Sequence, residues 1–319
     1  MSEKWLVGID LGGTSIKLAF ITLDGELVHK WHIPTNTSDG GRNITSDIAS
    51  SIKEQLSVCG GHQEYLQGIG MGAPAFIEMA TGYVYHAVNI GWREYALKEE
   101  LEAATGLPAV IDNDANVAAI GEMWKGAGDG SDQLLCVTLG TGVGGGIIIN
   151  GEIVHGINGM AGEIGHITVE TENGAPCNCG KTGCLETVAS ATGIVRLARQ
   201  AAVQNSKSIL RDVETLTAKD VFEVAEKGDT AAIQVIERVT HDLGLALANL
   251  SNAINPEKIV LGGGVSKAGN NLLKHLRKAF EKYALPRVSE GADLEIATLG
   301  NDAGVIGAAW LVKTKILSE

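Results

Sequence analysis

Two glycine-rich runs have residue types suited to binding phosphate. Asp10-Leu11-Gly12-Gly13-Thr14 follows an apolar segment, and TLGTGVGGG at residues 138–146 follows another. Glycine leaves backbone N–H groups open to phosphate oxygens, and a threonine or lysine adds a further donor. An aspartate would repel phosphate unless a divalent cation lay between them, so Asp10 predicts bound Mg²⁺. The predicted phosphate and cation residues are Asp10, Gly12, Gly13, Thr14, Lys17, Thr138, Gly140, Thr141, Gly142 and Gly144.

Either run taken alone has a plain β-turn as its alternative, because isolated glycine runs are common. The two runs hold equivalent places in a repeated pattern of strand, turn, strand, turn and strand, which favours phosphate binding. A third run, Gly262-Gly263-Gly264, ends another predicted strand. Bare backbone there would allow close approach of a flat ring such as adenine.

Polar residues crowd a predicted strand-to-helix junction in VIDNDANVAAIGEMW, residues 110–124. Asp114 lies at or near the N-cap, and helix capping alone is the alternative role for it. Capping needs one residue, however, and Asp112, Asn113 and Asn116 are present as well. A helix N-terminus favours an ionised carboxylate, which is the base that a phosphoryl-accepting hydroxyl requires. We therefore predict that Asp114 is a catalytic base.

One histidine and three cysteines between residues 166 and 184 supply the donors of a tetrahedral zinc site. They are His166, Cys177, Cys179 and Cys184. The spacing differs from that of zinc fingers, but Gly180 and Gly183 allow the loop to fold back. Reactive or merely buried thiols are the alternative. Four donors leave no open position, so the expected zinc is structural.

Two glutamates, Glu163 and Glu186, flank this loop and would be held in place by it. Two fixed carboxylates suit hydrogen bonds to the hydroxyls of a sugar, with exposed surface glutamates as the alternative. If zinc binds one nitrogen of His166, the other N–H remains a fixed donor for a substrate. Asn89 and Gly72 are weaker candidates for lining the same cleft. The other histidines are interpreted as ordinary residues.

Composition excludes several classes of protein. The 319 residues are 45% hydrophobic and 20% charged, as in a globular chain long enough for two domains. A net charge of −13 without a basic stripe argues against a nucleic-acid partner. The start lacks the pattern of a signal peptide and no apolar run is long enough to span a bilayer, so we expect a cytoplasmic protein without a membrane partner.

Hydrophobic periodicity predicts the same α/β order twice. Asp24-Gly25 and Asn150-Gly151 are hairpin signals at matching places. This repetition predicts two related α/β domains with a ligand cleft between them, the alternative being two unrelated hairpins. The predicted strands are 4–10, 16–21, 26–33, 66–72, 109–111, 134–139, 145–149, 258–261 and 294–299; the predicted helices are 44–56, 94–104, 115–125, a long stretch over 188–225, 231–254, one after residue 264, and one from about 303.

In order and nearly end to end, these motifs resemble the bacterial glucokinases of the ROK family, within the superfamily of actin, hexokinase and heat-shock-protein ATPases. IDLGGTSIK and LGTGVGGG match the two phosphate motifs, and LGGGVS matches the adenosine region. DNDAN carries the catalytic aspartate position, which falls on Asp114. GEIGH followed by CNCGKTGCLE matches the family signature with its zinc loop.

The resemblance implies two ribonuclease-H-like (actin-like ATPase) domains flanking a substrate cleft. It places one domain at residues 1–125 plus 303–319 and the other, with the zinc loop, at 126–302. It implies a glycolytic enzyme that phosphorylates glucose at its 6-hydroxyl with Mg–ATP, and a homodimer or larger assembly. The residues expected at the sugar are Asn113, Asp114, Glu163, His166 and Glu186.

Two alternatives remain open. Kinases for fructose, allose or N-acetylmannosamine share these motifs, and the motifs do not separate ATP from polyphosphate as donor. Sugar-responsive repressors of the same family carry a helix-turn-helix segment before the kinase-like part. The first predicted strand begins at about Lys4, which leaves no room for that segment, and the acidic charge disfavours DNA.

Overall fold

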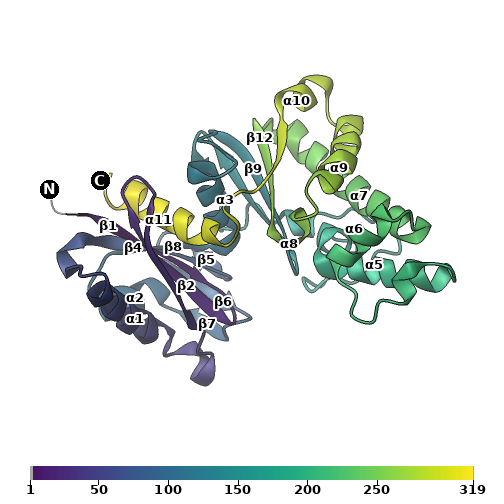
Figure 1. Cartoon of the computed structure of the whole chain (residues 1–319). Helices are drawn as coiled ribbons and strands as arrows, with labels where there is room; N and C mark the ends of the chain where they lie inside the picture. The colour runs from purple at the N-terminus through teal and green to yellow at the C-terminus, as the bar shows by residue number, and fades with distance from the viewer. Residues whose placement is uncertain (1–2, 319) are drawn as a thin grey trace. The chain divides into compact units, whose positions relative to one another are not determined.

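The computed structural model describes residues 3–318 (Figure 1). The chain forms two compact units. Unit 1 takes in the chain up to Gly130, Gly146–Gly162 and the chain from Leu299 on; unit 2 comprises Ser131–Gly145 and Glu163–Thr298. The domain boundaries expected near residues 125 and 303 stay a prediction. Among the described residues, no helix is long and apolar enough to cross a membrane.

The main sheet of unit 1 has the order β3-β2-β1-β4-β8. β1 pairs antiparallel with β2 and parallel with β4, and β4 pairs parallel with β8. The hairpin predicted at Asp24-Gly25 is confirmed, since the Gly25 N–H bonds to Thr22 O. The strands are β1 (Trp5–Leu11), β2 (Ser15–Thr22), β3 (Leu27–Pro34), β4 (Leu66–Ala73) and β8 (Ala109–Asn113).

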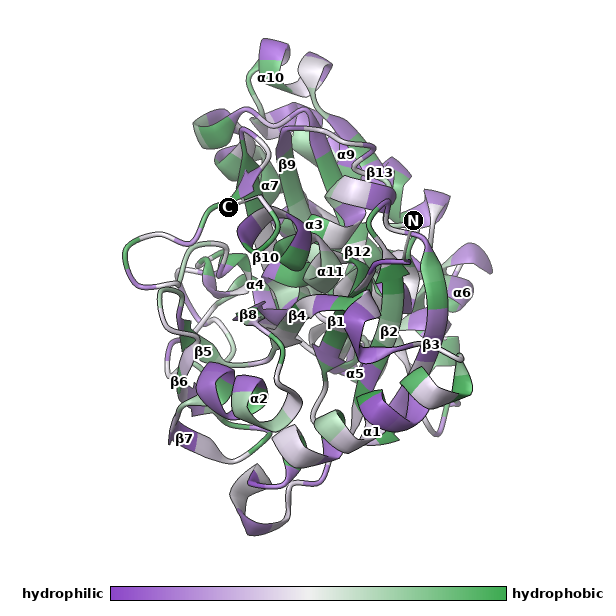
Figure 2. Ribbon diagram, turned by 90° about the vertical axis from the view of Figure 1, so that its left-hand side faces the viewer, coloured by the Kyte–Doolittle hydropathy of each residue, from purple (hydrophilic) through white to green (hydrophobic). Residues whose placement is uncertain are grey.

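Alternation along β1 assigns its two faces to different helices. Val7 and Ile9 join a core with residues of α1 (Ile44–Val58) and α2 (Leu97–Thr105). Leu6, on the opposite face, packs with α11 (Ala303–Lys315). Figure 1 shows α11, the yellow helix, lying along the purple strands of this sheet and beside α3 (Asp114–Lys125). The central strands of the sheets are mainly hydrophobic (Figure 2).

Four glycines allow α11 to approach its neighbours at backbone distance, and we call them the glycine seam. A Cβ on Gly8 or Gly70 would lie 2.0 Å from Val305 O or 1.7 Å from Ala308 O. A Cβ on Gly121 would lie 2.1 Å from Ala303 O, and one on Gly307 would lie 1.8 Å from Val117 O. Any larger residue would separate the helix from the sheet or from α3.

A small antiparallel sheet in unit 1, with the order β5-β6-β7, was not predicted. The helix expected from residue 94 begins instead at Leu97, because Glu94 has a φ of 49° and lies in a strand. Left-handed backbone of this kind is incompatible with a helix. The strands are β5 (Phe76–Glu78), β6 (Tyr83–Ala87) and β7 (Trp92–Tyr95).

The second five-stranded sheet has the order β11-β10-β9-β12-β13. β12 lies parallel between β9 and β13, and the predicted Asn150-Gly151 hairpin joins β10 to β11. The strands are β9 (Gln133–Leu139), β10 (Val143–Ile149), β11 (Glu152–Ile153), β12 (Lys258–Gly262) and β13 (Asp293–Ile296), so the last strand is shorter than predicted.

The single long helical stretch predicted over 188–225 is wrong. Ser190 is extended and caps α5, while Thr217 forms a capping box that starts α6. The side-chain oxygen of each residue accepts a backbone N–H from the first turn of the helix that follows. A new helix therefore begins at each of these positions, and the stretch is not continuous. The helices of unit 2 are α4 (Leu185–Ala189), α5 (Ala191–Gln204), α6 (Ala218–Glu226), α7 (Thr230–Ile254), α8 (Gly263–Ser266), α9 (Asn270–Tyr283) and α10 (Pro286–Gly291); the 3₁₀ turns of the chain are Ser38–Gly41, Gln63–Tyr65, Ile164–His166, Ile209–Arg211 and Gly300–Asp302.

Candidate active site

The first predicted phosphate loop is the tight turn between β1 and β2. The Gly12 N–H bonds to Ser15 O at 3.0 Å, and a Cβ on Gly12 would lie 2.8 Å from that oxygen. Thr35 braces the turn, since its hydroxyl donates to Gly12 O at 2.6 Å and its N–H to Thr14 O at 3.0 Å. The turn is therefore held with its glycines free of side chains, as a phosphate site requires.

Lys17 and Asp10 form an ion pair beside the first predicted phosphate loop. Lys17 Nζ lies 2.8 Å from Asp10 Oδ2, and both side chains are partly exposed. The lysine, which we expected to bind phosphate, contacts the carboxylate that we expected to bind the cation. Its charge offsets that of Asp10. The first turn of α11 lies against this carboxylate, because a Cβ on Gly304 would lie 2.8 Å from Asp10 Cγ.

Neighbouring strand ends bring the other unit 1 candidates to the same edge of the sheet. Gly72 pairs with both Asp10 and Asp112, at the carboxyl ends of three parallel strands. A Cβ on Gly72 would lie 3.4 Å from the Asp114 Cα, and one on Gly13 would lie 3.4 Å from the Asn89 Cβ. Carboxyl ends of parallel strands are where α/β folds bind ligands.

Asn113, rather than Asp114, is the N-cap of α3. The Asn113 Oδ1 accepts the N–H of Ala115 at 2.9 Å and that of Asn116 at 3.4 Å. Asp114 is the first helical residue, and its Oδ1 accepts the Ala115 N–H at 2.9 Å. Because Asn113 supplies the cap, capping alone does not account for the carboxylate at position 114.

In unit 2, the four predicted zinc ligands come together. One ring nitrogen of His166 and the Sγ atoms of Cys177, Cys179 and Cys184 all lie within 4.8 Å of one another. Cys177 Sγ is 3.6 Å from His166 Nδ1, and Cys179 Sγ is 3.6 Å from Cys184 Sγ. A tetrahedral zinc with Zn–S bonds of about 2.3 Å places its ligands about 3.8 Å apart, so the donor set fits this ion.

The zinc loop itself is a short hairpin. The Cys177 N–H bonds to Lys181 O at 2.8 Å, and the turn passes through Gly180 with a φ of 88°. A backbone hydrogen bond from Lys181 lowers the pKa of Cys179, whereas burial raises the pKa of Cys184 to about 12. Binding of a metal would therefore displace a proton from Cys184.

The predicted sugar ligands of unit 2 lie around this cluster. His166 directs Nδ1 to the cysteines and Nε2 toward Glu163, whose Oε2 is 3.8 Å away. Cys177 Sγ lies 3.9 Å from Glu186 Oε1. The cluster thus fixes the orientation of the imidazole and has a carboxylate on either side.

Glu186 also contacts the second predicted phosphate loop. Its Oε2 accepts the Val143 N–H at 3.0 Å and would lie 2.3 Å from a Cβ on Gly142. The first turn of α5 also holds this loop. The Ala191 N–H donates to Gly140 O, and the Thr192 hydroxyl donates to Thr141 O. One carboxylate therefore joins the predicted zinc loop to the predicted phosphate loop. Gly144 follows this loop as a residue of β10.

The third glycine run, Gly262-Gly263-Gly264, lies beside the start of the second predicted phosphate loop. Thr138 pairs with Gly262, and Gly263 has a φ of 83° with its missing Cβ 2.4 Å from Leu139 O. Gly264 lines a pocket of about 620 Å³ together with residues of α6 and with Val265, Lys267, Ala268 and Asn271. This pocket is large enough for a nucleoside.

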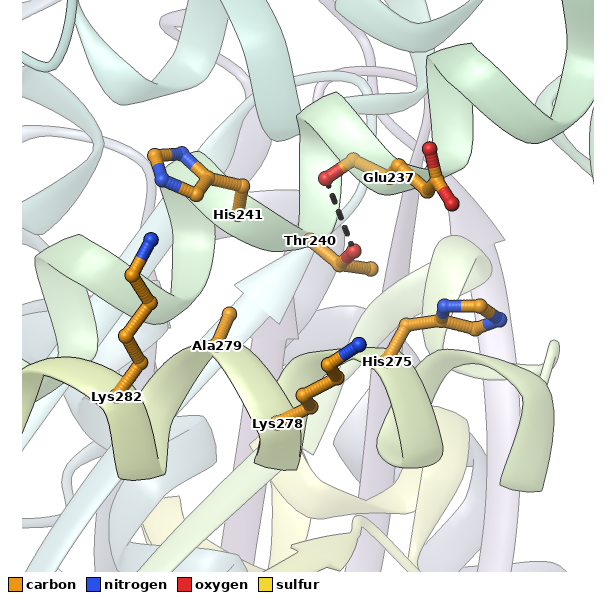
Figure 3. A pocket seen from close by; sticks show the side chains of 7 residues that line it. All are labelled: Glu237, Thr240, His241, His275, Lys278, Ala279 and Lys282. Atoms are coloured by element: carbon orange, nitrogen blue, oxygen red, sulfur yellow. Dashed lines mark hydrogen bonds between the residues drawn. The ribbon is translucent and has the colours of Figure 1, made fainter.

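A further pocket, of about 420 Å³, lies between α7 and α9 and contains none of the predicted site residues. Figure 3 shows Lys278 and Lys282 of α9 and His241 of α7 at its sides, with Thr240 and Ala279 between them.

His155, which we predicted to be an ordinary residue, lies against the strand end that precedes the predicted base. Its Nε2 lies 2.7 Å from Asp112 Oδ2. The two residues are 43 positions apart, and no local pattern marks the pairing.

The chain is similar over nearly its whole length to known glucokinases. A glucokinase of Halalkalibacterium halodurans is 62% identical over 98% of this chain and 96% of its own length. A glucokinase of Thermotoga maritima is 36% identical over 99% of each chain. The crystal structure of a ROK family glucokinase from Streptomyces griseus, in complex with glucose and AMPPNP, superposes with a TM-score of 0.77 at 34% identity, covering 96% of this chain and 98% of that one.

These neighbours confirm the predicted fold class, two ribonuclease-H-like domains of the actin-like ATPase type. The model of the ROK family matches residues 6–315, which include every predicted site residue. The chain belongs to the ROK family.

Proposed function

We propose that this chain is a glucokinase that transfers the γ-phosphoryl group of ATP to the 6-hydroxyl of glucose. The observation that carries the proposal is the 62% identity to a glucokinase over nearly the whole of both chains. The glycine loops, the strand end with Asp114 and the zinc-loop glutamates provide the residue types that each part of this reaction needs.

In the proposed reaction, Asp114 accepts the proton of the hydroxyl as that oxygen attacks the γ-phosphorus in line. Asn113, Glu163, His166 and Glu186 would bind the sugar hydroxyls, with Gly72 beside the base and Asn89 near Gly13. Oriented binding of this kind lowers the barrier by placing the attacking oxygen near the phosphorus.

The two glycine loops would hold the phosphates of ATP, with adenosine against Gly262-Gly263-Gly264. Asp10 would hold Mg²⁺, directly or through water, and this ion neutralises phosphate charge when bound. His166 Nδ1 and the thiolates of Cys177, Cys179 and Cys184 would hold a structural zinc. The role of that ion is to brace the loop that carries the sugar ligands.

We also infer the properties that follow from family membership. They are a homodimer or larger assembly, a role in glycolysis, and a division into domains 1–125 plus 303–319 and 126–302. Dependence on ATP supports a cytoplasmic location.

Steady-state ADP release with Mg–ATP tests the function. The sugars are glucose, fructose, allose and N-acetylmannosamine, with a sugar-free control and with polyphosphate as an alternative donor. Release that depends on glucose is the expected result. If ADP is released only with another hexose, that hexose and not glucose is the substrate. If no sugar causes ADP release, the kinase proposal is refuted.

Asp114→Asn tests the assignment of the base. We expect kcat to fall about 10²- to 10⁴-fold, the usual contribution of a general base, while the dissociation constant for glucose changes less than about threefold. The control is Asp293→Asn, the same change at an exposed position of β13. Turnover by Asp114→Asn at the wild-type rate would remove Asp114 from the mechanism.

A further inference from the structure

The carboxylate of Asp112 is buried, with 3% of the side chain exposed, and both of its oxygens are bonded. Its Oδ1 accepts the Asn113 N–H at 2.7 Å and the Asn116 Nδ2–H at 2.9 Å. Its Oδ2 contacts His155 Nε2 at 2.7 Å. A buried carboxylate is stable only when its oxygens are bonded in this way.

These bonds join the end of β8 to the first turn of α3. Asn113 is the N-cap and Asn116 is in the first turn, so Asp112 holds a residue on each side of Asp114. The direction of the Asp114 side chain depends on the backbone of this turn. Asp112 therefore has the geometry to fix the proposed base without contacting a substrate.

His155 brings a second segment to the same point. It follows β11, where the Val154 N–H bonds to Ile147 O at 2.8 Å, and its own carbonyl accepts the Ala161 N–H at 3.0 Å. The imidazole is 26% exposed, so one side of it is packed. The segment then runs to Gly162, directly before the proposed sugar ligand Glu163.

We propose that Asp112 and His155 are positioning residues for phosphoryl transfer. Asp112 holds the turn that carries Asp114, and His155 completes the bonding of Asp112 while anchoring the segment that leads into Glu163. The inference rests on the proposed kinase function and adds two residues to its machinery. With Nε2 as a donor, the contact forms with either a neutral or a charged imidazole.

Loss of the imidazole would leave one oxygen of a buried carboxylate without its partner. Asp112 would then turn toward solvent and release the Asn113 and Asn116 bonds that define the turn. A displacement of about 1 Å at a catalytic group reduces a rate by up to about 10²-fold. Of the proposed glucose ligands, only Asn113 and Asp114 lie in this turn. Glu163, His166 and Glu186 do not contact Asp112, so sugar binding should change less than turnover.

The test compares His155→Ala, His155→Leu, His155→Gln and wild type. The measurements are kcat and KM for glucose by ADP release, the glucose dissociation constant by intrinsic fluorescence, and folding by circular dichroism. A purely structural contact would lower stability but leave kcat of the folded protein unchanged. The control is His241→Ala, because His241 also contacts an aspartate, with Nδ1 2.9 Å from Asp242 Oδ1. It lies on α7 in the pocket of Figure 3, which contains none of the proposed site residues.

We expect kcat of His155→Ala and His155→Leu to fall tenfold or more, with the glucose dissociation constant within about threefold of wild type. His155→Gln, whose amide still donates to Asp112, should recover most of the lost kcat, and His241→Ala should match wild type. A folded alanine or leucine variant with wild-type kcat would overturn the inference. Failure of both variants to fold would also overturn it, because the pair would then be a folding determinant.

Failure of the kinase function has a different signature. Wild type would then release no ADP with any sugar, whereas failure of this inference leaves wild type active and the His155 variants equally so.

Discussion

Gly307→Ala perturbs the glycine seam at the point where α11 crosses α3. The new Cβ would lie 1.8 Å from Val117 O and 2.7 Å from the Gly121 N, whereas real Cβ contacts stay above 3.0 Å. Both neighbours are backbone atoms of one helix, so no side chain is able to rotate away. The two helices must therefore separate by more than about 1 Å.

The expected loss of stability follows from two opposing effects. Overpacking of a rigid core costs about 1–3 kcal/mol, and a clash with backbone belongs at the upper end. Alanine is a better helix former than glycine by about 1 kcal/mol, which offsets part of this cost. We expect a net loss of about 2 kcal/mol, which corresponds to a fall in Tm of roughly 4–8 °C for a domain of this size.

The same displacement reaches the proposed active site, because α3 begins at Asp114. We expect kcat for glucose phosphorylation to fall severalfold at a temperature where the variant is folded. The assay is thermal unfolding by circular dichroism together with ADP release at 20 °C.

Gly291→Ala is the matched control. Gly291 ends α10, has no positive φ, and a Cβ there meets nothing within 4 Å. This substitution should leave Tm unchanged or raise it slightly. A Tm for Gly307→Ala equal to or above that of wild type would refute the argument that the seam requires glycine.

Other predictions concern the zinc loop and a helix cap. Wild type should contain about one zinc per chain, and Cys179→Ser should lose this zinc and raise KM for glucose. The control is Cys59→Ser, which changes an isolated thiol and should alter neither the zinc content nor KM. A metal-free protein of full activity would contradict this prediction. Burial opposes ionisation of Asp229, but the N–H groups of Ala232 and Ile209 outweigh it and lower the pKa of this carboxyl. The ionised carboxylate therefore stabilises the folded protein at pH values above the pKa of the unfolded state, near 3.8. This stabilisation is lost as the pH falls through the lower pKa of the folded state. Asp229→Asn should therefore lower the free energy of unfolding in urea at pH 7, and progressively less below about pH 4; an equal loss at both pH values would contradict it.

Local patterns were sufficient for the elements that carry the site. Glycine turns after apolar runs, the Asp24-Gly25 hairpin and the spacing of Ile44, Ile48 and Ile52 each follow from the chemistry of neighbouring residues. The four predicted zinc ligands also proved to lie together, since a short loop with two flexible glycines leaves few other arrangements.

Features that depend on distant contacts were missed. The β5-β6-β7 sheet contains short strands whose pairing, not their periodicity, defines them. The N-cap of α3 was predicted at Asp114 but is Asn113. Aspartate and asparagine are both good N-caps, and only the backbone conformation shows which of the two residues lies at the cap. The contact of His155 with Asp112 spans 43 residues and has no local signal.

The packing of α11 on unit 1 has a consequence for synthesis of the chain. β1, β4 and β8 leave the ribosome well before α11, because all of unit 2 is translated in between. At 5–20 residues per second the delay is on the order of 10 to 40 s. During that time Leu6, Ala19 and Ile21, which α11 later covers, remain open to chaperones and proteases. A prematurely terminated chain would therefore expose an apolar surface that marks it for degradation, and unit 1 would be completed only after unit 2 has been made.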